Sequence, residues 1–250
     1  VPGGESISSE DYFPDGWLTA TVPATVLMSY VNAGAVPDPN YDDNLNKISE
    51  SFFNGDFWYR REFDADPGNV GKEFFLCLDG INWKAEVWLN GKNVAFVEGA
   101  FTRSRSRVVL REHNILAVKI IGNKHVGAVK EKTALTTGLN GGILGADNPT
   151  YHASIGWDWI TTVRGRNSGI WNDVFLTPVK EVRLSDPLVT TKLSSDGKAS
   201  MTASVIVDGR DCTGKDFEVC GWIGDKKFSK PVKAGFCGEV TFSPEDFPVL

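Results

Sequence analysis

The chain has 250 residues, a mass of 27.3 kDa, 41% hydrophobic residues and a formal net charge of −6. A chain of this size buries roughly 72% of its unfolded surface on folding, so its core needs no metal or disulfide to be stable. No apolar run approaches the ~18 residues of a transmembrane helix, and the acidic balance offers no basic surface to nucleic acid. We therefore expect a globular protein of one large or two modest domains, with no cofactor, no nucleic acid and no membrane as partners.

Short apolar or alternating segments recur between turn residues, which is typical of an all-β sandwich or barrel. The predicted strands cover residues 57–63, 73–79, 85–89, 94–97, 107–110, 115–121, 174–176, 189–193, 199–207, 217–223 and 238–242. Between two of them, Leu89-Asn90-Gly91-Lys92 predicts a type I′ hairpin, because Asn-Gly accepts positive φ at both central positions.

One helix is predicted over residues 25–32, ahead of two long connections. Thr25 can cap its first turn, and Gly34 can adopt the left-handed conformation just past its end. A polar connection follows over residues 37–54, and a second irregular region extends over residues 122–166. Loops of this length in a compact domain usually carry function, so we expect binding groups there.

A change in composition near residues 177–181 predicts a domain boundary. Seven of the eight tryptophans lie at or before Trp171, whereas the later sequence is rich in Val, Thr and Ser. Short strands about every ten residues are typical of an immunoglobulin-like sandwich. We therefore predict a first domain over residues 1–178 and an immunoglobulin-like domain over residues 179–250, cut short because such domains have about 100 residues.

The cysteines and histidines indicate no metal or redox centre. Cys77 lies in an apolar run and is predicted to be a core thiol. One disulfide or free thiols remain open for the other three cysteines, Cys212, Cys220 and Cys237. The histidines, His113, His125 and His152, lack metal-ligand spacing. The cysteine pattern leaves the compartment open, with a secreted or periplasmic location preferred to a cytoplasmic one.

One basic cluster interrupts the acidic balance. Arg103, Arg105 and Arg107 alternate with small polar residues, so they share one face of a predicted strand. A solvated sheet face is preferred here to a phosphate site.

The most informative segment is Gly156-Trp157-Asp158-Trp159, in which two indole rings flank one carboxylate. At a strand end, Trp157 and Trp159 would form the wall of a pocket that Asp158 reaches. This combination binds sugars, because the apolar face of a sugar ring stacks on aromatic side chains and a carboxylate accepts hydroxyl hydrogen bonds. The structural alternative is that both rings fill the core and Asp158 caps a turn.

Residues 81–91 form the other dense stretch. One strand face is predicted to carry Asn82, Lys84 and Glu86, and the opposite face carries Trp83, Ala85 and Val87. Trp88 departs from this pattern as a large apolar residue on the polar face. Core packing explains most of the stretch, and a polar face near a strand start can also line a cleft.

No complete catalytic site is visible in the sequence. A glycosidase needs two carboxylates about 5 Å or about 6.5–9.5 Å apart, and the carboxylates here are scattered. The sequence has neither a Gly-x-Ser-x-Gly nucleophile elbow nor a phosphate-binding loop. We therefore assign no catalytic residue and no metal ligand to this chain.

In their order and spacing, several motifs resemble the N-terminal part of glycoside hydrolase family 2 enzymes. They are Trp17 with Val22-Pro23-Ala24-Thr25, Pro37-Asp38-Pro39-Asn40-Tyr41, Phe57-Trp58-Tyr59-Arg60, Asp79-Gly80-Ile81-Asn82-Trp83, Gly156-Trp157-Asp158-Trp159 and Ser168-Gly169-Ile170-Trp171. The resemblance covers nearly all of residues 12–176. It is similar to the β-mannosidase, endo-β-mannosidase and exo-β-D-glucosaminidase branch, although Ile160-Thr161 stands where many β-mannosidases have Gly-Pro.

This resemblance implies an all-β chain, with a jelly-roll (galactose-binding-like) sandwich followed by a partial immunoglobulin-like sandwich. In the family, a TIM barrel that bears both catalytic carboxylates comes next, so this chain would be a non-catalytic portion of a retaining hydrolase. It would pack on that barrel and help to shape a pocket for a β-linked oligosaccharide or glycoside. The motif match implies that Asp158 binds sugar hydroxyls and that Trp157 and Trp159 shape the wall, with Asn82 and Trp83 at further family positions.

Two other functions remain open at this point. The chain could be a free-standing carbohydrate-binding sandwich, which the aromatic residues around two long loops favour. It could also be a structural or interaction domain whose apolar face forms a dimer.

Overall fold

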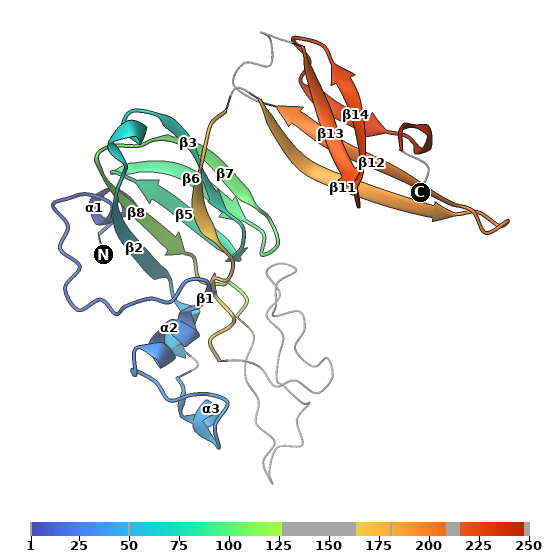
Figure 1. The fold of residues 1–250 in the computed structure, drawn as a ribbon. Helices are drawn as coiled ribbons and strands as arrows, with labels where there is room; N and C mark the ends of the chain where they lie inside the picture. The colour runs from blue at the N-terminus through green and yellow to red at the C-terminus, as the bar shows by residue number, and fades with distance from the viewer. Residues whose placement is uncertain (1, 50, 127–163, 181, 209–215, 248–250) are drawn as a thin grey trace. The chain divides into compact units, whose positions relative to one another are not determined.

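The computed structural model describes residues 2–49, 51–126, 164–180, 182–208 and 216–247 (Figure 1). The chain forms two compact units, Val1–Pro178 and Val179–Leu250, and each is described by itself. The strands of both units pair antiparallel, and the described helices are short. None of these helices has the length and apolar character needed to cross a membrane.

Unit 1 is a sandwich of two main sheets around one core. The first sheet has the strand order β2 (Phe57–Asp64), β8 (His113–Ile120), β5 (Lys84–Leu89) and β6 (Lys92–Glu98). The second has the order β10 (Val174–Pro178), β3 (Glu73–Leu78) and β7 (Ser104–Val109). The core takes side chains from both sheets, such as Leu78, Val87 and Ile120. Each such side chain contributes about 1.5–3 kcal/mol through burial, so the shared core holds the two sheets together.

The hairpin between β5 and β6 confirms the predicted turn. Asn90 and Gly91 have φ values of 52° and 81°, and Leu89 pairs with Lys92 across the turn. Along β5, buried and half-buried residues alternate, as expected for a strand with one face on the core.

The structure corrects the predicted placement of Asn82 and explains the exception at Trp88. Asn82 does not share a face with Lys84 and Glu86, because it ends a separate strand, β4 (Ile81–Asn82). Trp88 does lie on the outer face, but the short helix α1 (Gly4–Ile7) covers it. A Cβ atom on Gly4 would lie 2.3 Å from the Trp88 ring, so only glycine permits this close packing.

A small third sheet joins distant parts of unit 1. Its strand order is β1 (Ala24–Thr25), β9 (Gly169–Ile170) and β4. The predicted helix is confirmed as α2 (Val26–Asn32), with the Thr25 hydroxyl accepting the Met28 N–H at 3.1 Å and Gly34 at φ 73°. Among the described residues of unit 1, the remaining helices are α3 (Asn44–Lys47), η1 (Ser51–Asn54) and η2 (Pro67–Asn69).

Unit 2 is a second, smaller sandwich. One sheet has the order β11 (Arg183–Leu193), β12 (Ala199–Asp208) and β15 (Gly238–Phe242). The other is the hairpin of β13 (Phe217–Ile223) and β14 (Lys226–Val232), and the helix η5 (Pro244–Asp246) follows β15. Val207, Val219 and Val232 belong to one buried cluster that joins both sheets.

The prediction of an all-β chain with two successive sandwiches is confirmed. Strand β14 was not predicted, because three lysines and Pro231 interrupt its apolar pattern. The predicted core thiol is confirmed, since Cys77 is buried and free. Cys220 is also free, whereas Cys237 is disulfide-bonded.

The arginine stripe has the character of a solvated sheet face. Arg105 and Arg107 are exposed on β7, whereas Ser104 and Ser106 are half-buried. The Arg107 guanidinium lies 5.5 Å from the centre of the Phe75 ring on the neighbouring strand, so this cation is placed over an aromatic face.

Candidate functional site

Asn82 and Trp83 lie together at the end of β4, where both are buried, with exposed fractions of 3% and 6%. Asn82 pairs with Gly169 on β9, and its side-chain N–H donates to the Asn167 carbonyl at 2.9 Å. The Lys84 ammonium lies 4.4 Å from the centre of the Trp83 ring. The two candidate residues are therefore fixed by a strand and by the turn that precedes β9.

Within the described parts of the chain, two polar atoms of this pair have no hydrogen-bond partner. They are Asn82 Oδ1, an acceptor, and Trp83 Nε1, a donor, and both are buried. Leaving such a group unpaired costs about 1–3 kcal/mol, and such groups in native proteins often have a functional reason. A donor and an acceptor on consecutive residues can bind a hydroxyl group, which both accepts and donates.

The turn before β9 begins just after residues 127–163, and it is hydrogen-bonded to the residue just before them. Arg166 is 1% exposed, and its Nε donates to the Val126 carbonyl at 2.8 Å. Arg164 Nη1 donates to the Ile48 carbonyl at 3.2 Å. The bond from Arg166 to Val126 therefore brings the two ends of this long segment together at the turn. Asn82 contacts the same turn through its bond to Asn167.

Three of the five predicted site residues, Trp157, Asp158 and Trp159, lie outside the described residues, as does His152. The structure brings Asn82 and Trp83 together, and the roles of all five residues remain predictions. Arg164 and Arg166 were not among the residues predicted to form the site. Their contacts with carbonyl groups distant in sequence have no local signal that could have predicted them.

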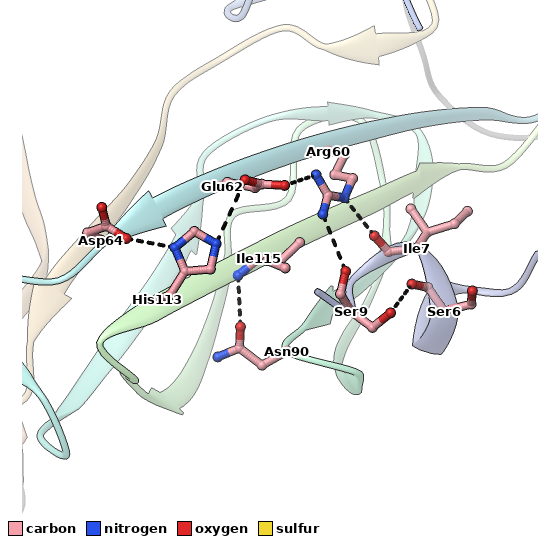
Figure 2. A network of polar contacts seen from close by, with 9 residues as sticks. All are labelled: Ser6, Ile7, Ser9, Arg60, Glu62, Asp64, Asn90, His113 and Ile115. Carbon is pink, nitrogen blue, oxygen red and sulfur yellow. Dashed lines mark hydrogen bonds and ion pairs between the residues drawn. The ribbon is translucent and has the colours of Figure 1, made fainter. Parts of the chain in front are cut away.

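A second polar network lies on β2 and β8 (Figure 2). The Arg60 guanidinium, whose side chain is 6% exposed, donates from Nε to the Ile7 carbonyl at 2.9 Å and also contacts Glu62. His113 Nδ1 lies 2.7 Å from Asp64 Oδ1. Because Arg60 holds the end of α1 on the sheet, we interpret this network as structural.

Replacing Asp64 with asparagine should lower the pKa of His113. The hydrogen bond and charge of Asp64 hold that pKa above its ordinary value of 6.5. A histidine with a raised pKa stabilises the fold fully below its unfolded value, and this contribution is lost as the pH rises through the folded value. Asp64→Asn should therefore reduce stability at about pH 5.5 more than at about pH 8.5.

NMR titration of the His113 ring and urea unfolding at the two pH values provide the measurement. Asp66→Asn removes a nearby exposed carboxylate as a matched control and should leave the pKa of His113 unchanged. An equal loss of stability at both pH values would contradict the role of the His113 charge.

Among the described residues, no group of three His, Cys, Asp or Glu side chains is arranged to hold a metal ion. The carboxylates that form ion pairs do so with basic side chains of the fold. Asp208, for example, accepts two hydrogen bonds from Arg183, at 2.8 and 2.6 Å.

Known proteins give the family context for this site. Residues 5–172 match the family model described as the glycosyl hydrolase 2 galactose-binding domain-like domain. The mannosylglycoprotein endo-beta-mannosidase of Lilium longiflorum is 32% identical over 180 residues, which cover 68% of this chain and 18% of the relative. The exo-beta-D-glucosaminidase of Amycolatopsis orientalis is 27% identical over 240 residues, which cover 93% of this chain and 21% of the relative. The chain thus spans about a fifth of the length of these curated relatives.

Solved structures share the fold. An exo-chitosanase of Amycolatopsis orientalis, in complex with PNP-beta-D-glucosamine, matches with a TM-score of 0.71 at 23% identity. That match covers 100% of this chain and 27% of the exo-chitosanase. A beta-D-mannosidase from Dictyoglomus thermophilum matches with a TM-score of 0.68 at 20% identity, over 92% of this chain and 29% of the mannosidase. Since the family model covers well over half of the sequence, this chain belongs to the galactose-binding-like domain family of glycosyl hydrolase family 2.

Proposed function

We propose that the chain is the non-catalytic N-terminal portion of a retaining family 2 glycoside hydrolase that acts on β-linked mannosides or glucosaminides. The observation that carries this proposal is the buried, unpaired acceptor and donor on Asn82 and Trp83, beside the turn that closes the segment bearing Asp158. The names of the relatives, an endo-beta-mannosidase and an exo-beta-D-glucosaminidase, support the substrate class.

In this proposal the catalytic work is divided between domains. Residues 1–178 form the jelly-roll sugar-binding domain and residues 179–250 form an immunoglobulin-like domain. A TIM barrel of the same polypeptide supplies both catalytic carboxylates, about 5–5.5 Å apart as retention requires. The small share of each relative that this chain covers supports a catalytic domain elsewhere in the protein.

The sugar pocket then forms where the first domain meets the barrel. Asp158 accepts hydrogen bonds from the hydroxyls of the terminal sugar, and Trp157 and Trp159 form an aromatic wall. Asn82 and Trp83 offer one acceptor and one donor at the base of the same segment. Because part of the pocket belongs to the barrel, the isolated chain should bind sugar weakly, with a Kd on the order of mM.

Turnover assays on aryl β-mannosides, β-glucosaminides, β-galactosides and β-glucuronides test the proposal. The 250-residue chain and the longer protein that carries the barrel are compared on the same panel. We expect only the longer protein to cleave, and only the mannosides or glucosaminides. Cleavage by the 250-residue chain would overturn the non-catalytic assignment, and preference for galactosides or glucuronides would overturn the branch.

A further inference from the structure

A cavity of about 390 Å³ in unit 1 shares no lining residue with the candidate site at Asn82 and Trp83. It lies between residues 16–20, helix α2 and the start of β2. Aromatic side chains dominate its walls, and they include Trp17, Tyr30, Phe52 and Trp58. Small-molecule sites typically have about 300–1,000 Å³, so this cavity has a suitable volume.

The aromatic wall is held rigid by its own ring contacts. Tyr30 packs edge to face with Phe52 and Phe57, at centroid distances of 5.1 and 6.3 Å. Phe52 also contacts Phe57 at 5.7 Å, yet 48% of Phe52 is exposed. The Trp17 ring, which also lines the cavity, makes an edge contact with Tyr12 at 6.0 Å. A wall ordered in advance lowers the entropic cost of binding a ligand.

The polar groups of the cavity fit hydroxyls. The Tyr59 hydroxyl is fully buried beside Ser29 and the Ile170 backbone, so it lies behind the wall of the cavity. Burial raises the pKa of Tyr59 to about 12, so the group stays a neutral donor and acceptor. Asp56 Oδ1 accepts the Gly122 N–H at 2.8 Å, and Oδ2 pairs with Lys119 at 2.9 Å.

The ion pair of Asp56 with Lys119 indicates that the cavity suits an uncharged ligand. Because the carboxylate is already balanced by an ammonium group, the cavity gives a cationic ligand little net attraction. A purely apolar ligand would cover the half-exposed Asp56 carboxylate without offering it a hydrogen bond. A neutral pyranose satisfies both conditions, since it has an apolar ring face and hydroxyl groups.

We propose that this cavity is a second carbohydrate site, which binds one neutral hexopyranose unit between Trp17, Phe52 and Trp58. The site is independent of the pocket proposed around Asp158. Its ligand stacks on the aromatic wall and donates hydroxyl hydrogen bonds to the Asp56 carboxylate. The expected Kd is on the order of mM, because the cavity offers few polar contacts.

Titration of the 250-residue chain, followed through the indole N–H signals by NMR, tests this site. The probes are methyl β-D-glucopyranoside, methyl β-D-mannopyranoside and the cationic methyl β-D-glucosaminide. We expect saturable shifts of Trp17 and Trp58 with the two neutral probes, a Kd for the cation that is no lower than theirs, and no shift of Trp222. Trp17→Phe and Trp58→Phe assign the two signals.

Variants separate this site from the pocket around Asp158. Ala20→Trp, at an exposed lining position, should fill the cavity and raise the Kd at least tenfold without unfolding the chain. Trp222→Ala, at an exposed tryptophan of unit 2, is the matched control and should leave the Kd unchanged. Asp158→Ala should also leave the Trp17 and Trp58 shifts unchanged.

Two results would overturn the second site. The first is the absence of any shift at Trp17 and Trp58 in the folded chain at 100-fold the expected Kd. The second is a sugar response confined to Trp157 and Trp159 and abolished by Asp158→Ala, which would support the proposed function alone. A response at Trp17 and Trp58 that survives Asp158→Ala supports the second site even if the proposed function fails.

Discussion

Replacing Gly169 with alanine should lower the free energy of unfolding of unit 1 by about 3–5 kcal/mol. Gly169 has φ of 139°, a conformation that side-chain-bearing residues rarely adopt. A Cβ atom there would lie 2.9 Å from the Ala24 carbonyl oxygen and 2.9 Å from the Val26 nitrogen. Because both atoms belong to backbone and β1 pairs with β9 at this point, neither neighbour can move aside cheaply.

Urea unfolding followed by tryptophan fluorescence measures this effect in a Trp222→Phe background. The remaining seven tryptophans all lie within unit 1, so the signal reports the unfolding of that unit alone. Gly34→Ala is the matched control, since Gly34 also has positive φ, 73°, but no atom within 4 Å of the added Cβ. It should cost only about 1 kcal/mol, and an equal loss for both variants would show that backbone crowding at Gly169 is unimportant.

The elements that the sequence predicts correctly depend on local chemistry. Asn90 and Gly91 accept positive φ whatever their surroundings, and the hydroxyl of Thr25 caps the turn that immediately follows it. The alternation along β5 likewise reflects one buried and one outer face. Such signals lie within a few residues of the feature they specify.

The errors arise where partners lie far apart in the sequence. Asn82 leaves the predicted strand because it pairs with β9 and bonds to Asn167, 85 residues further along. Trp88 does lie on the predicted face, but α1, which covers it and lies more than seventy residues earlier in the chain, was not predicted. No periodicity within residues 81–91 reports either contact.

The candidate sites also depend on contacts that the local sequence does not report. The residues Asn82 and Trp83 were recognised from their motif, but only the structure reveals that each has an unpaired buried polar atom. The aromatic cavity was missed because Trp17 and the other rings come from three separate segments. A usable signal was the density of aromatic residues at Phe52, Phe53, Phe57, Trp58 and Tyr59.

Replacing Asp158 with alanine should reduce kcat/KM of the longer protein at least about 100-fold on its preferred aryl glycoside. A hydrogen bond to a charged group contributes about 1.5–3 kcal/mol, and a carboxylate that binds two sugar hydroxyls makes two of them. Loss of both removes about 3–6 kcal/mol of binding to the transition state, which exceeds the ~2.7 kcal/mol of a 100-fold effect. Steady-state kinetics of the purified variant give the measurement.

Two further variants separate the role of Asp158 from a structural role. Asp158→Asn retains one acceptor but loses the charge, so its kcat/KM should lie between those of the alanine variant and the parent protein. Asp147→Ala removes a carboxylate from the same segment of the sequence and should change kcat/KM less than about threefold, because the proposed hydrogen bonds to the sugar remain intact. If all three variants lose the same activity and also unfold at lower temperature, Asp158 stabilises the fold and does not bind the sugar. If activity falls only at position 158, with an unchanged melting temperature, the carboxylate binds the sugar as the paired indoles around it predict.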